Sequence, residues 1–288
     1  MARILAAAQY AARAGDVEAN VARHVRYASA AAGLGVSLLV FPELSLTGYE
    51  PELIAAHSEL TLHAQDARLD PLRALARRES IALLVGAPVR FGADALHIAM
   101  LAFLPDGKVA VYTKRNLHGG ERGVFAPGLG GPVLQLGRVP VAMAICSDVA
   151  KAEFAAEAAQ GKAKVYAASV LLSEAGYEAD ASLLRGYAKT HGMAVVMANH
   201  AEPTGGWVPA GRSAIWDERG MVVAASAGCE EALVLARRQG NGWEGAVFPM
   251  QAAAALRLRE AAVPEAVAQV REELRLVQGS LFGDSSQD

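Results

Sequence analysis

The sequence lacks the marks of several protein classes. Its 288 residues include only two cysteines, too few for a disulfide framework. No apolar run approaches the roughly 18 residues that a membrane-spanning helix needs, and the short N-terminal apolar stretch, interrupted by Arg13, does not resemble a signal peptide. The net charge is −3 and basic residues do not cluster as nucleic-acid binding requires. We therefore expect a cytoplasmic protein that binds neither membrane nor nucleic acid.

Metal and cofactor motifs are also scarce. The seven histidines are scattered, and no pair has the spacing and Cys or Asp neighbours of a metal site. The stretch GNGWEG, residues 240–245, fits G-x-G-x-x-G but does not open a strand–helix–strand unit, so we interpret it as a loop. We expect no metal and no cofactor.

Hydrophobic residues make up 53% of the chain, enough for a large core, and their periodicity predicts alternating strands and helices with hairpins between them. This pattern favours an α/β fold with a mixed pair of sheets and helices outside. One domain over 1–282 and a frayed tail over 283–288 are expected, with the last core strand at 231–236. Helices are predicted at 15–33, 70–80 (capped by Asp70), 151–160, 179–191 and from Gln251 onward.

Three apolar strands end on reactive side chains. LLVFPE ends on Glu43, VAVYTK on Lys114 and VAMAIC on Cys146. Strand ends in α/β folds converge on ligand sites. A thiol attacks a carbonyl carbon only as thiolate, so it needs a base such as Glu43. Lys114 and the N–H after the cysteine can hold the resulting oxyanion. The three residues together suffice for acyl transfer without histidine or metal.

Several longer motifs resemble one family. FPELSLTGY (41–49), YTKRNLHGGERGVFAPG (112–128) and AICSD (144–148) together resemble the nitrilase superfamily of carbon–nitrogen hydrolases. LLRGYAKTHGMAVVMAN (183–199) and GRSAIWDERG (211–220) extend the similarity over nearly the whole chain. The resemblance implies an α-β-β-α sandwich. It also implies a homodimer or higher homo-oligomer, in which two sandwiches pack helix to helix.

The resemblance implies a role for each reactive residue. Glu43 matches the general base, Lys114 the oxyanion-binding lysine and Cys146 the nucleophile. Glu121 matches the family's second glutamate, which orients the lysine and the substrate; the alternative for Glu121 is a loop salt bridge with a neighbouring arginine. We expect four more side chains to contact the substrate: Tyr49, His118, Ser147 and Ser169.

The residues after Cys146 favour one branch of the family. Nitrilases resemble C-W-E, whereas this chain has Cys146-Ser147-Asp148, and the aspartate is typical of amidases and carbamoyl hydrolases. Carbamoyl amino acid hydrolases add arginines where Val149 and Ala150 stand here. We therefore expect hydrolysis of a small linear amide through a cysteine thioester, releasing ammonia and a carboxylic acid.

Other functions stay open at this point. A carbamoyl amino acid hydrolase or a nitrilase would use the same reactive residues. A Cys–His hydrolase could use His118 or His200, because such partners need not be close in sequence. A protein of the same fold with an inactive site would act as a binding or scaffold protein.

Overall fold

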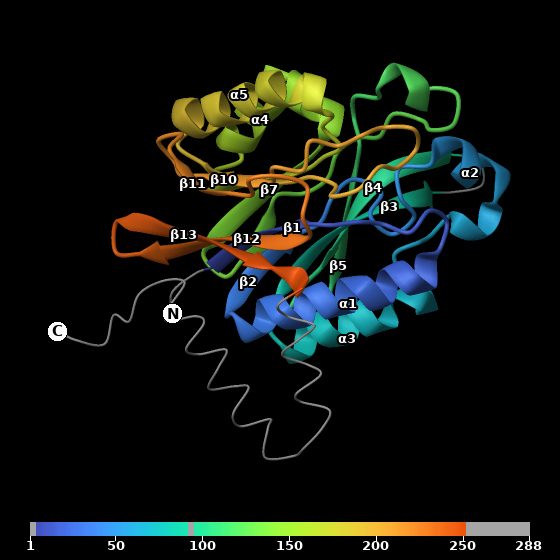
Figure 1. The fold of residues 1–288 in the computed structure, drawn as a ribbon, viewed down its shortest axis with the longest axis horizontal. Coiled ribbons are helices and arrows are strands. Elements are labelled where there is room, and N and C mark those ends of the chain that lie inside the picture. The colour runs from blue at the N-terminus through green and yellow to red at the C-terminus, as the bar shows by residue number, and fades with distance from the viewer. Residues whose placement is uncertain (1–3, 92–94, 252–288) are drawn as a thin grey trace, which may run out of the picture.

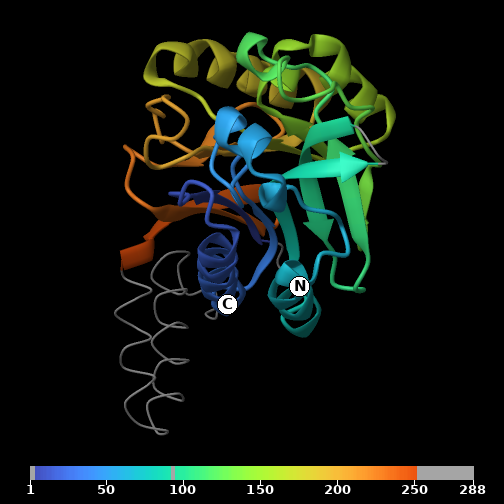
Figure 2. The same ribbon diagram turned by 90° about the vertical axis from the view of Figure 1, so that its right-hand side faces the viewer.

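The structure, a computed structural model, describes residues 4–91 and 95–251 of the chain. Two β-sheets pack face to face, and helices cover the outer face of each sheet (Figures 1 and 2). The predicted α-β-β-α sandwich is therefore confirmed. The predicted helix after Gln251 and the tail at 283–288 lie outside the described residues. Among the described helices, none combines the length and the hydropathy needed to cross a membrane.

The larger sheet has seven strands in the order β13-β12-β1-β2-β3-β4-β5. Strands β1, β2 and β3 are parallel, and the other neighbours are antiparallel. Because β4 reverses the chain and β5 reverses it again, β5 ends at the same edge as β2. The bounds are β1 (Ile4–Gln9), β2 (Val36–Val40), β3 (Ala82–Phe91), β4 (Ala95–Phe103), β5 (Val109–Thr113), β12 (Ala232–Gln239) and β13 (Gly242–Pro249).

The smaller sheet has six strands in the order β11-β10-β9-β8-β7-β6. Its central strands β7, β8 and β9 are parallel. The carboxyl ends of β8 and β2 meet across the two sheets, where the Ser169 hydroxyl donates a hydrogen bond of 2.8 Å to the Phe41 carbonyl. The bounds are β6 (Leu134–Leu136), β7 (Val139–Ile145), β8 (Val165–Ser169), β9 (Ala194–Ala198), β10 (Ala214–Trp216) and β11 (Val222–Ala225).

Helices form the outer layers. Figure 1 shows α1 and α3 below the larger sheet and α4 and α5 above the smaller one. Asp16 caps α1 by accepting a hydrogen bond from the Ala19 N–H at 2.9 Å, close to the predicted start. The bounds are α1 (Val17–Gly33), α2 (Pro51–Ala56), α3 (Asp70–Arg78), α4 (Ala152–Gln160) and α5 (Glu174–His191), with 3₁₀ turns at Ser58–Leu60, Ala67–Leu69, Gly119–Glu121 and Cys146–Ala150.

Some predicted boundaries are wrong. Helix α5 begins at Glu174, five residues before the predicted start. Its first turn contains Gly176, and glycine has a low helix propensity, so the sequence pattern placed the start too late. Asp70 lies inside α3 and is not its cap; Asp66 instead caps the 3₁₀ turn that precedes the helix.

The predicted final strand is also not the last. Strand β13 follows it, so the 240–245 stretch is a hairpin turn and a strand start instead of a loop. As a half-buried edge strand rich in glycine, β13 lacks the apolar run by which inner strands are found.

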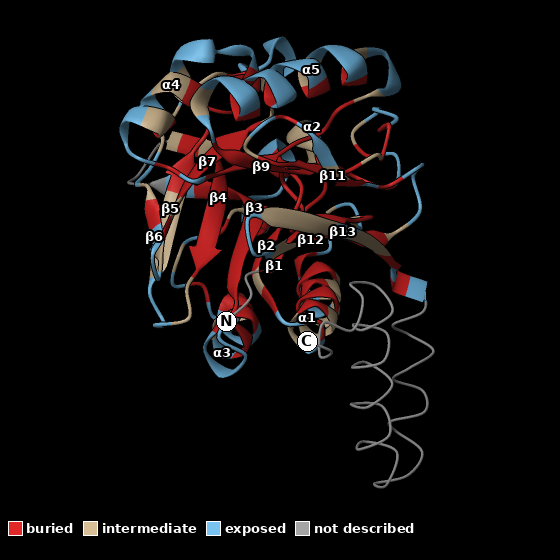
Figure 3. Cartoon of the chain, turned by 90° about the vertical axis from the view of Figure 1, so that its left-hand side faces the viewer, coloured by how far each residue is buried: buried red, intermediate tan, exposed pale blue. Residues whose placement is uncertain are grey.

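Two apolar layers stabilise the sandwich. One cluster lies between the sheets and extends under α1 and α3, and the other lies between the smaller sheet and its helices. The burial colouring of Figure 3 shows both sheets as mostly buried. Ala6, Ala7 and Ala8 of β1 are fully buried, and β1 contacts β9 of the opposite sheet. Small side chains at this contact let the two sheets approach closely.

Gly86 in β3 determines where the chain passes after β2. A Cβ atom added at Gly86 would lie 2.4 Å from the Leu44 nitrogen, 2.4 Å from the Pro42 oxygen and 2.9 Å from the Glu43 carbonyl carbon. The Gly86 carbonyl accepts a hydrogen bond from the Leu46 N–H, and the Gly86 N–H donates to the Ser45 hydroxyl. The segment that carries Glu43 therefore lies directly against a glycine.

We expect Gly86→Ala to displace this segment and to destabilise the fold. The added methyl meets backbone atoms that have no rotamer to change, so the loss should be about 1–3 kcal/mol in the free energy of unfolding. Urea denaturation measures it. The control is Gly186→Ala on α5, where an added Cβ meets nothing within 4 Å; it should stabilise by about 0.5–1 kcal/mol. Equal stabilities for the two variants would contradict the close approach.

Candidate active site

A cavity of about 210 Å³ opens where β2 and β7 end. It brings together the two predicted glutamates and the predicted cysteine, which come from three separate segments of the chain. Three of the four side chains expected to contact the substrate also reach it. The lining residues are Glu43, Tyr49, His118, Glu121, Cys146, Ser147, Ala150, Leu171, Leu172, Ser173, Gly176, Asp180 and Trp207.

Lys114 lies beside this cavity, fully buried, and contacts both glutamates. Its Nζ atom donates to Glu43 Oε1 at 2.6 Å and to Glu121 Oε1 at 2.6 Å. Burial alone would lower the pKa of Lys114, but the negative charges of Glu43 and Glu121 outweigh it and raise that pKa. The ammonium therefore stays charged. Because an ammonium has three hydrogens and two are used, one remains for a further acceptor.

Glu121 fixes the position of the lysine. Its Oε1 also accepts a hydrogen bond from the Tyr49 hydroxyl at 2.7 Å, and its Oε2 accepts one from the His118 N–H at 2.8 Å. The nearby Arg115 pairs with Glu157 at 2.6 Å instead. The alternative for Glu121, a loop salt bridge with a neighbouring arginine, is therefore not what the structure has.

Glu43 is a carboxylate with one oxygen available. Its Oε1 is used by Lys114, whereas its Oε2 is buried and has no hydrogen-bond partner among the described residues. Burial raises the pKa of Glu43 to about 7; the Lys114 charge opposes this shift and the Glu121 charge adds to it. A carboxylate that titrates near neutral pH is suited to general-base work.

The backbone around Glu43 is held from two sides. The buried His200 ring donates from Nε2 to the Glu43 carbonyl at 2.7 Å, and burial lowers the pKa of His200 to about 4, so this ring is neutral. Leu44 has a φ of +51°, a left-handed conformation that non-glycine residues rarely adopt. Such strain persists only where surrounding contacts impose it, and it is common at functional sites.

Cys146 occupies a strained position directly after β7. Its φ is +43°, and its thiol donates to the Leu171 carbonyl at 3.5 Å. Burial raises the pKa of the Cys146 thiol well above its ordinary value; the Glu43 charge adds to this effect and the Lys114 charge opposes it. The Glu43 carboxyl, whose Oε2 has no partner among the described residues, lines the same cavity as this thiol. The resting sulfur is therefore protonated and has a base beside it.

Asp148 connects the cysteine segment to the lysine segment. Its Oδ1 accepts hydrogen bonds from the Arg115 N–H at 3.1 Å and the Asn116 N–H at 2.7 Å. Its Oδ2 accepts from the Tyr112 hydroxyl at 3.0 Å and the Ile145 N–H at 3.1 Å. Sequence reasoning used Asp148 only to choose among branches of a family and missed this positioning role. Its signal was an acidic residue in the short polar stretch that follows the buried strand β7 and Cys146.

Two serines that were expected to contact the substrate differ from expectation. Ser147 lines the cavity, but its hydroxyl donates to the Asn116 carbonyl at 2.5 Å and so is already committed within the chain. Ser169 is fully buried and does not line the cavity. Its hydroxyl joins the two sheets through Phe41, so the expected contact with substrate is replaced by a structural role.

The two candidate histidines of a Cys–His pair are placed differently. His118 lines the cavity, where its ring lies 5.6 Å from the Trp207 ring at 84° and its Nδ1 accepts from the Gly120 N–H. His200 is outside the lining and its Nε2 is used by the Glu43 backbone. Among the described residues, the Cys146 thiol donates its hydrogen bond to the Leu171 carbonyl, and neither histidine is bonded to it.

One wall of the cavity was not predicted. Leu171, Leu172, Ser173 and the first turns of α5 form it, including Gly176 and Asp180. The late predicted start of that helix accounts for Gly176 alone; the other wall residues reach the cavity through packing that no sequence pattern marks.

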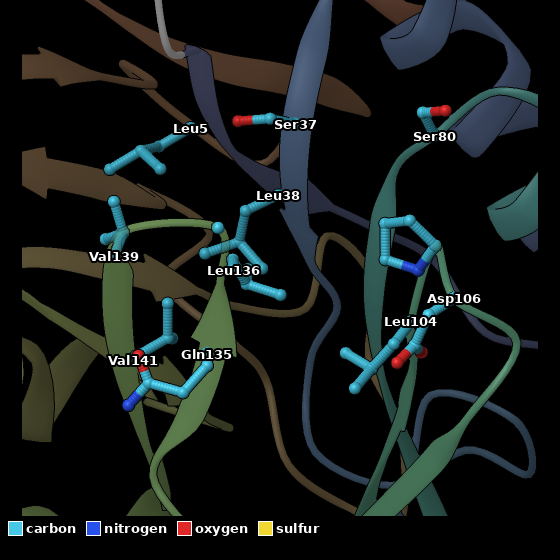
Figure 4. Close-up of a pocket in the computed structure, with 12 residues that line it drawn as sticks. Leu5, Ser37, Leu38, Ser80, Leu104, Asp106, Gln135, Leu136, Val139 and Val141 are labelled. Carbon is cyan, nitrogen blue, oxygen red and sulfur yellow. The ribbon is translucent and has the colours of Figure 1, made fainter.

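A different cavity of about 310 Å³ lies at the opposite ends of the strands (Figure 4). Leu5, Leu38, Leu136, Val139 and Val141 give it a largely apolar lining. None of the predicted site residues lines it, so we assign the chemistry to the cavity that holds Cys146.

The chain matches the carbon–nitrogen hydrolase family over residues 4–245. It belongs to that family. Among solved structures, an amidase from Nesterenkonia sp. AN1 is similar to this hydrolase, with 30% identity and a TM-score of 0.75 over 83% of this chain and 93% of that one. A variant of that amidase, with acrylamide added at its active-site cysteine, is 30% identical with a TM-score of 0.74, covering 81% and 92% of the two chains.

Two further proteins extend the comparison. A cysteine variant of the same Nesterenkonia amidase, in complex with butyramide, is 29% identical with a TM-score of 0.75 over 82% of this hydrolase and 90% of that chain. A glutamine-dependent NAD(+) synthetase from Thermotoga maritima is 31% identical over 140 residues, which are 47% of this chain and 24% of the synthetase. The match thus spans about a quarter of that curated relative.

We expect Asp148→Asn to lower the stability of the protein and to change the reactivity of Cys146. An amide at this position presents a donor to groups that already donate, so at least one buried hydrogen bond is lost at a cost of about 1–3 kcal/mol in the free energy of unfolding. Urea denaturation and the alkylation rate of Cys146 by iodoacetamide measure the two effects. Glu157→Gln is the control, since it removes an exposed ion pair and should change stability by under about 1 kcal/mol. An Asp148→Asn protein as stable and as reactive as the parent would contradict the positioning role.

Proposed function

We propose that this hydrolase is an amidase that cleaves the C–N bond of a small linear amide and releases ammonia and a carboxylic acid. The observation that carries the proposal is one cavity edge holding Cys146, the free oxygen of Glu43 and an ammonium held by two carboxylates. The similarity to an amidase whose active-site cysteine takes covalent adducts supports it. The modest volume of the cavity, about 210 Å³, favours a small substrate.

The first half of the reaction uses the neighbouring base. Glu43 Oε2 takes the thiol proton while the Cys146 sulfur bonds to the amide carbon, and the carbonyl electron pair moves to oxygen. The remaining Lys114 hydrogen and the Ser147 N–H hold that oxyanion, and losing one such donor typically slows a reaction by about 10²–10³-fold. Glu43 then passes its proton to the amide nitrogen. The C–N bond breaks, ammonia leaves and a thioester remains.

The second half repeats these steps with water. Glu43 takes a proton from a water molecule, whose oxygen attacks the thioester carbon. The C–S bond breaks, and the sulfur recovers the proton from Glu43 as the acid leaves. Lys114 keeps its charge throughout because its pKa is raised by the carboxylates around it. Every proton transfer therefore passes through one carboxyl group.

The cavity lining supports an amide over a carbamoyl amino acid. A carbamoyl amino acid brings a carboxylate that needs a cation, yet no Lys or Arg stands among the described residues of the lining. Val149 is buried, and Lys151 is exposed and outside the lining. The Ser147-Asp148 pair supports an amide over a nitrile, because the resemblance links that aspartate to amidases.

We also infer that the chain is a homo-oligomer of the cytoplasm. The inference rests on the family resemblance, on the need of a thiol nucleophile for a reducing compartment, and on Leu183, a partly exposed apolar residue on the outer helix layer. Light scattering of the purified chain measures the oligomeric state.

Replacing Cys146 by Ala should abolish ammonia release from butyramide, because no other group in the cavity can form the thioester. Circular dichroism should show an unchanged fold. Cys229→Ala is the matched control: Cys229 is exposed and lies outside the cavity, so activity should stay within about twofold of the parent. Full activity in the Cys146→Ala protein would end the thioester proposal. A parent chain that releases no ammonia would favour the alternative function, a binding or scaffold protein of the same fold.

The rate should depend on pH through Glu43. This base works only when ionised, and its pKa is raised to about 7, so kcat/KM should fall below pH 7 by about tenfold per pH unit. Measurement of kcat/KM on butyramide from pH 5 to 8 gives the midpoint. Glu157→Gln, which changes an exposed residue outside the cavity lining, should leave the midpoint unchanged. A flat profile over this range would show that Glu43 is not the base.

A further inference from the structure

Asp180 is a carboxylate in the catalytic cavity that the reaction above does not use. It lies on α5 and lines the same cavity as Cys146. Burial raises the pKa of Asp180, and no charged group of the described residues acts on it to offset that shift. No hydrogen bond or ion pair joins its carboxylate to the rest of the described chain. Placing a carboxylate in a partly buried site without a partner is unfavourable.

Two cations that contact α5 or the cavity glutamates are committed elsewhere. The Arg212 guanidinium forms ion pairs with Glu174 and Glu178 of α5, at 3.1 and 3.0 Å. It also lies 3.8 Å from the centre of the Tyr177 ring. Lys114 is held by its two glutamates. Asp180 is thus the acidic residue of the α5 wall that faces the cavity without a cation.

The helix also leaves room beside this carboxylate. Gly176 lies one turn before Asp180 and lines the same cavity. A Cβ atom added at Gly176 would meet only the Ser173 hydroxyl, at 3.7 Å. The absent side chain therefore leaves open space next to Asp180, where part of a ligand fits.

The approach to the cavity is acidic as well. An outer cavity of about 490 Å³ shares Tyr49, His118 and Trp207 with the inner one and includes Glu50 and Glu52. Neither lining contains Lys or Arg among the described residues. A cleft lined by charges of one sign concentrates ligands of the opposite sign.

We propose that Asp180 binds the positively charged end of the substrate, so that the enzyme prefers linear amides with a primary ammonium or guanidinium group at the end away from the amide. This inference rests on the proposed amidase function and names its substrate class. A cationic end would form a charge-assisted hydrogen bond with the unpartnered carboxylate. An anionic end would be repelled by Asp180 and by the two outer glutamates.

Matched substrates test the preference. 4-Aminobutanamide and pentanamide have the same number of non-hydrogen atoms and differ in charge at the far end. The parent enzyme should show at least about tenfold higher kcat/KM for the cationic amide. A hydrogen bond to a charged group changes a binding constant by about 10–100-fold. 4-Guanidinobutanamide should share the preference, and succinamate should be the poorest substrate.

Variants assign the preference to one carboxylate. Asp180→Asn should lower the ratio of the two kcat/KM values by about 10–100-fold, whereas Asp180→Glu, which keeps the charge, should retain part of it. Glu178→Gln is the matched control, because it removes a charge from the same helix outside the cavity and should leave the ratio unchanged. A ratio near one in the parent, or one that Asp180→Asn does not change, would overturn the inference and leave the amidase proposal standing.

A binding measurement separates the two proposals. With Cys146→Ala, 4-aminobutanamide should raise the melting temperature more than pentanamide does, and Asp180→Asn should remove the difference. If the parent hydrolyses no amide but this difference is present, the amidase proposal fails while the cation site remains. If the two amides raise the melting temperature equally, the cation site is refuted, whether or not the parent enzyme is active.

Discussion

The ammonium of Lys114, held between Glu43 and Glu121 at 2.6 Å each, is the interaction on which the site depends. All three side chains are fully buried, and removing one partner from such a cluster leaves an uncompensated charge. The cluster raises the pKa of the lysine, keeps it charged and leaves one of its hydrogens for a further acceptor. The same burial brings Glu43 to a pKa of about 7. A fixed cation and a base active near neutral pH thus have one physical cause.

The arrangement of the strands in the sandwich makes this cluster possible. Strands β2, β5 and β7 end at one edge, which brings residues from three distant segments together. Gly86 lets the Glu43 segment lie against β3, and Asp148 joins the cysteine segment to the lysine segment through three hydrogen bonds. Cys146, with its left-handed backbone, directly follows Ile145, whose N–H donates to Asp148. The reactive groups are therefore placed by backbone packing more than by their own interactions.

Sequence reasoning identified much of the site because reactive residues interrupt apolar strands. Glu43, Lys114 and Cys146 stand out at strand ends, and the resemblance added Glu121. It failed where the distinguishing feature was spatial. Ser169 ends a strand as well, but its hydroxyl turns to the opposite sheet. Asp180 lies inside the predicted helix, and only the packing of α5 shows that it lines the cavity; β13 is an edge strand without a continuous apolar run.

By itself, the sequence determined the layered α/β architecture and the identity of the reactive residues, because apolar periodicity and residue chemistry are local properties. The tertiary structure decided which polar groups meet and in what protonation state. Whether a carboxylate is paired with Lys114, left with a free oxygen or left without a cation depends on burial and on neighbours far away in the chain. Those are properties of packing, and no short stretch of sequence contains them.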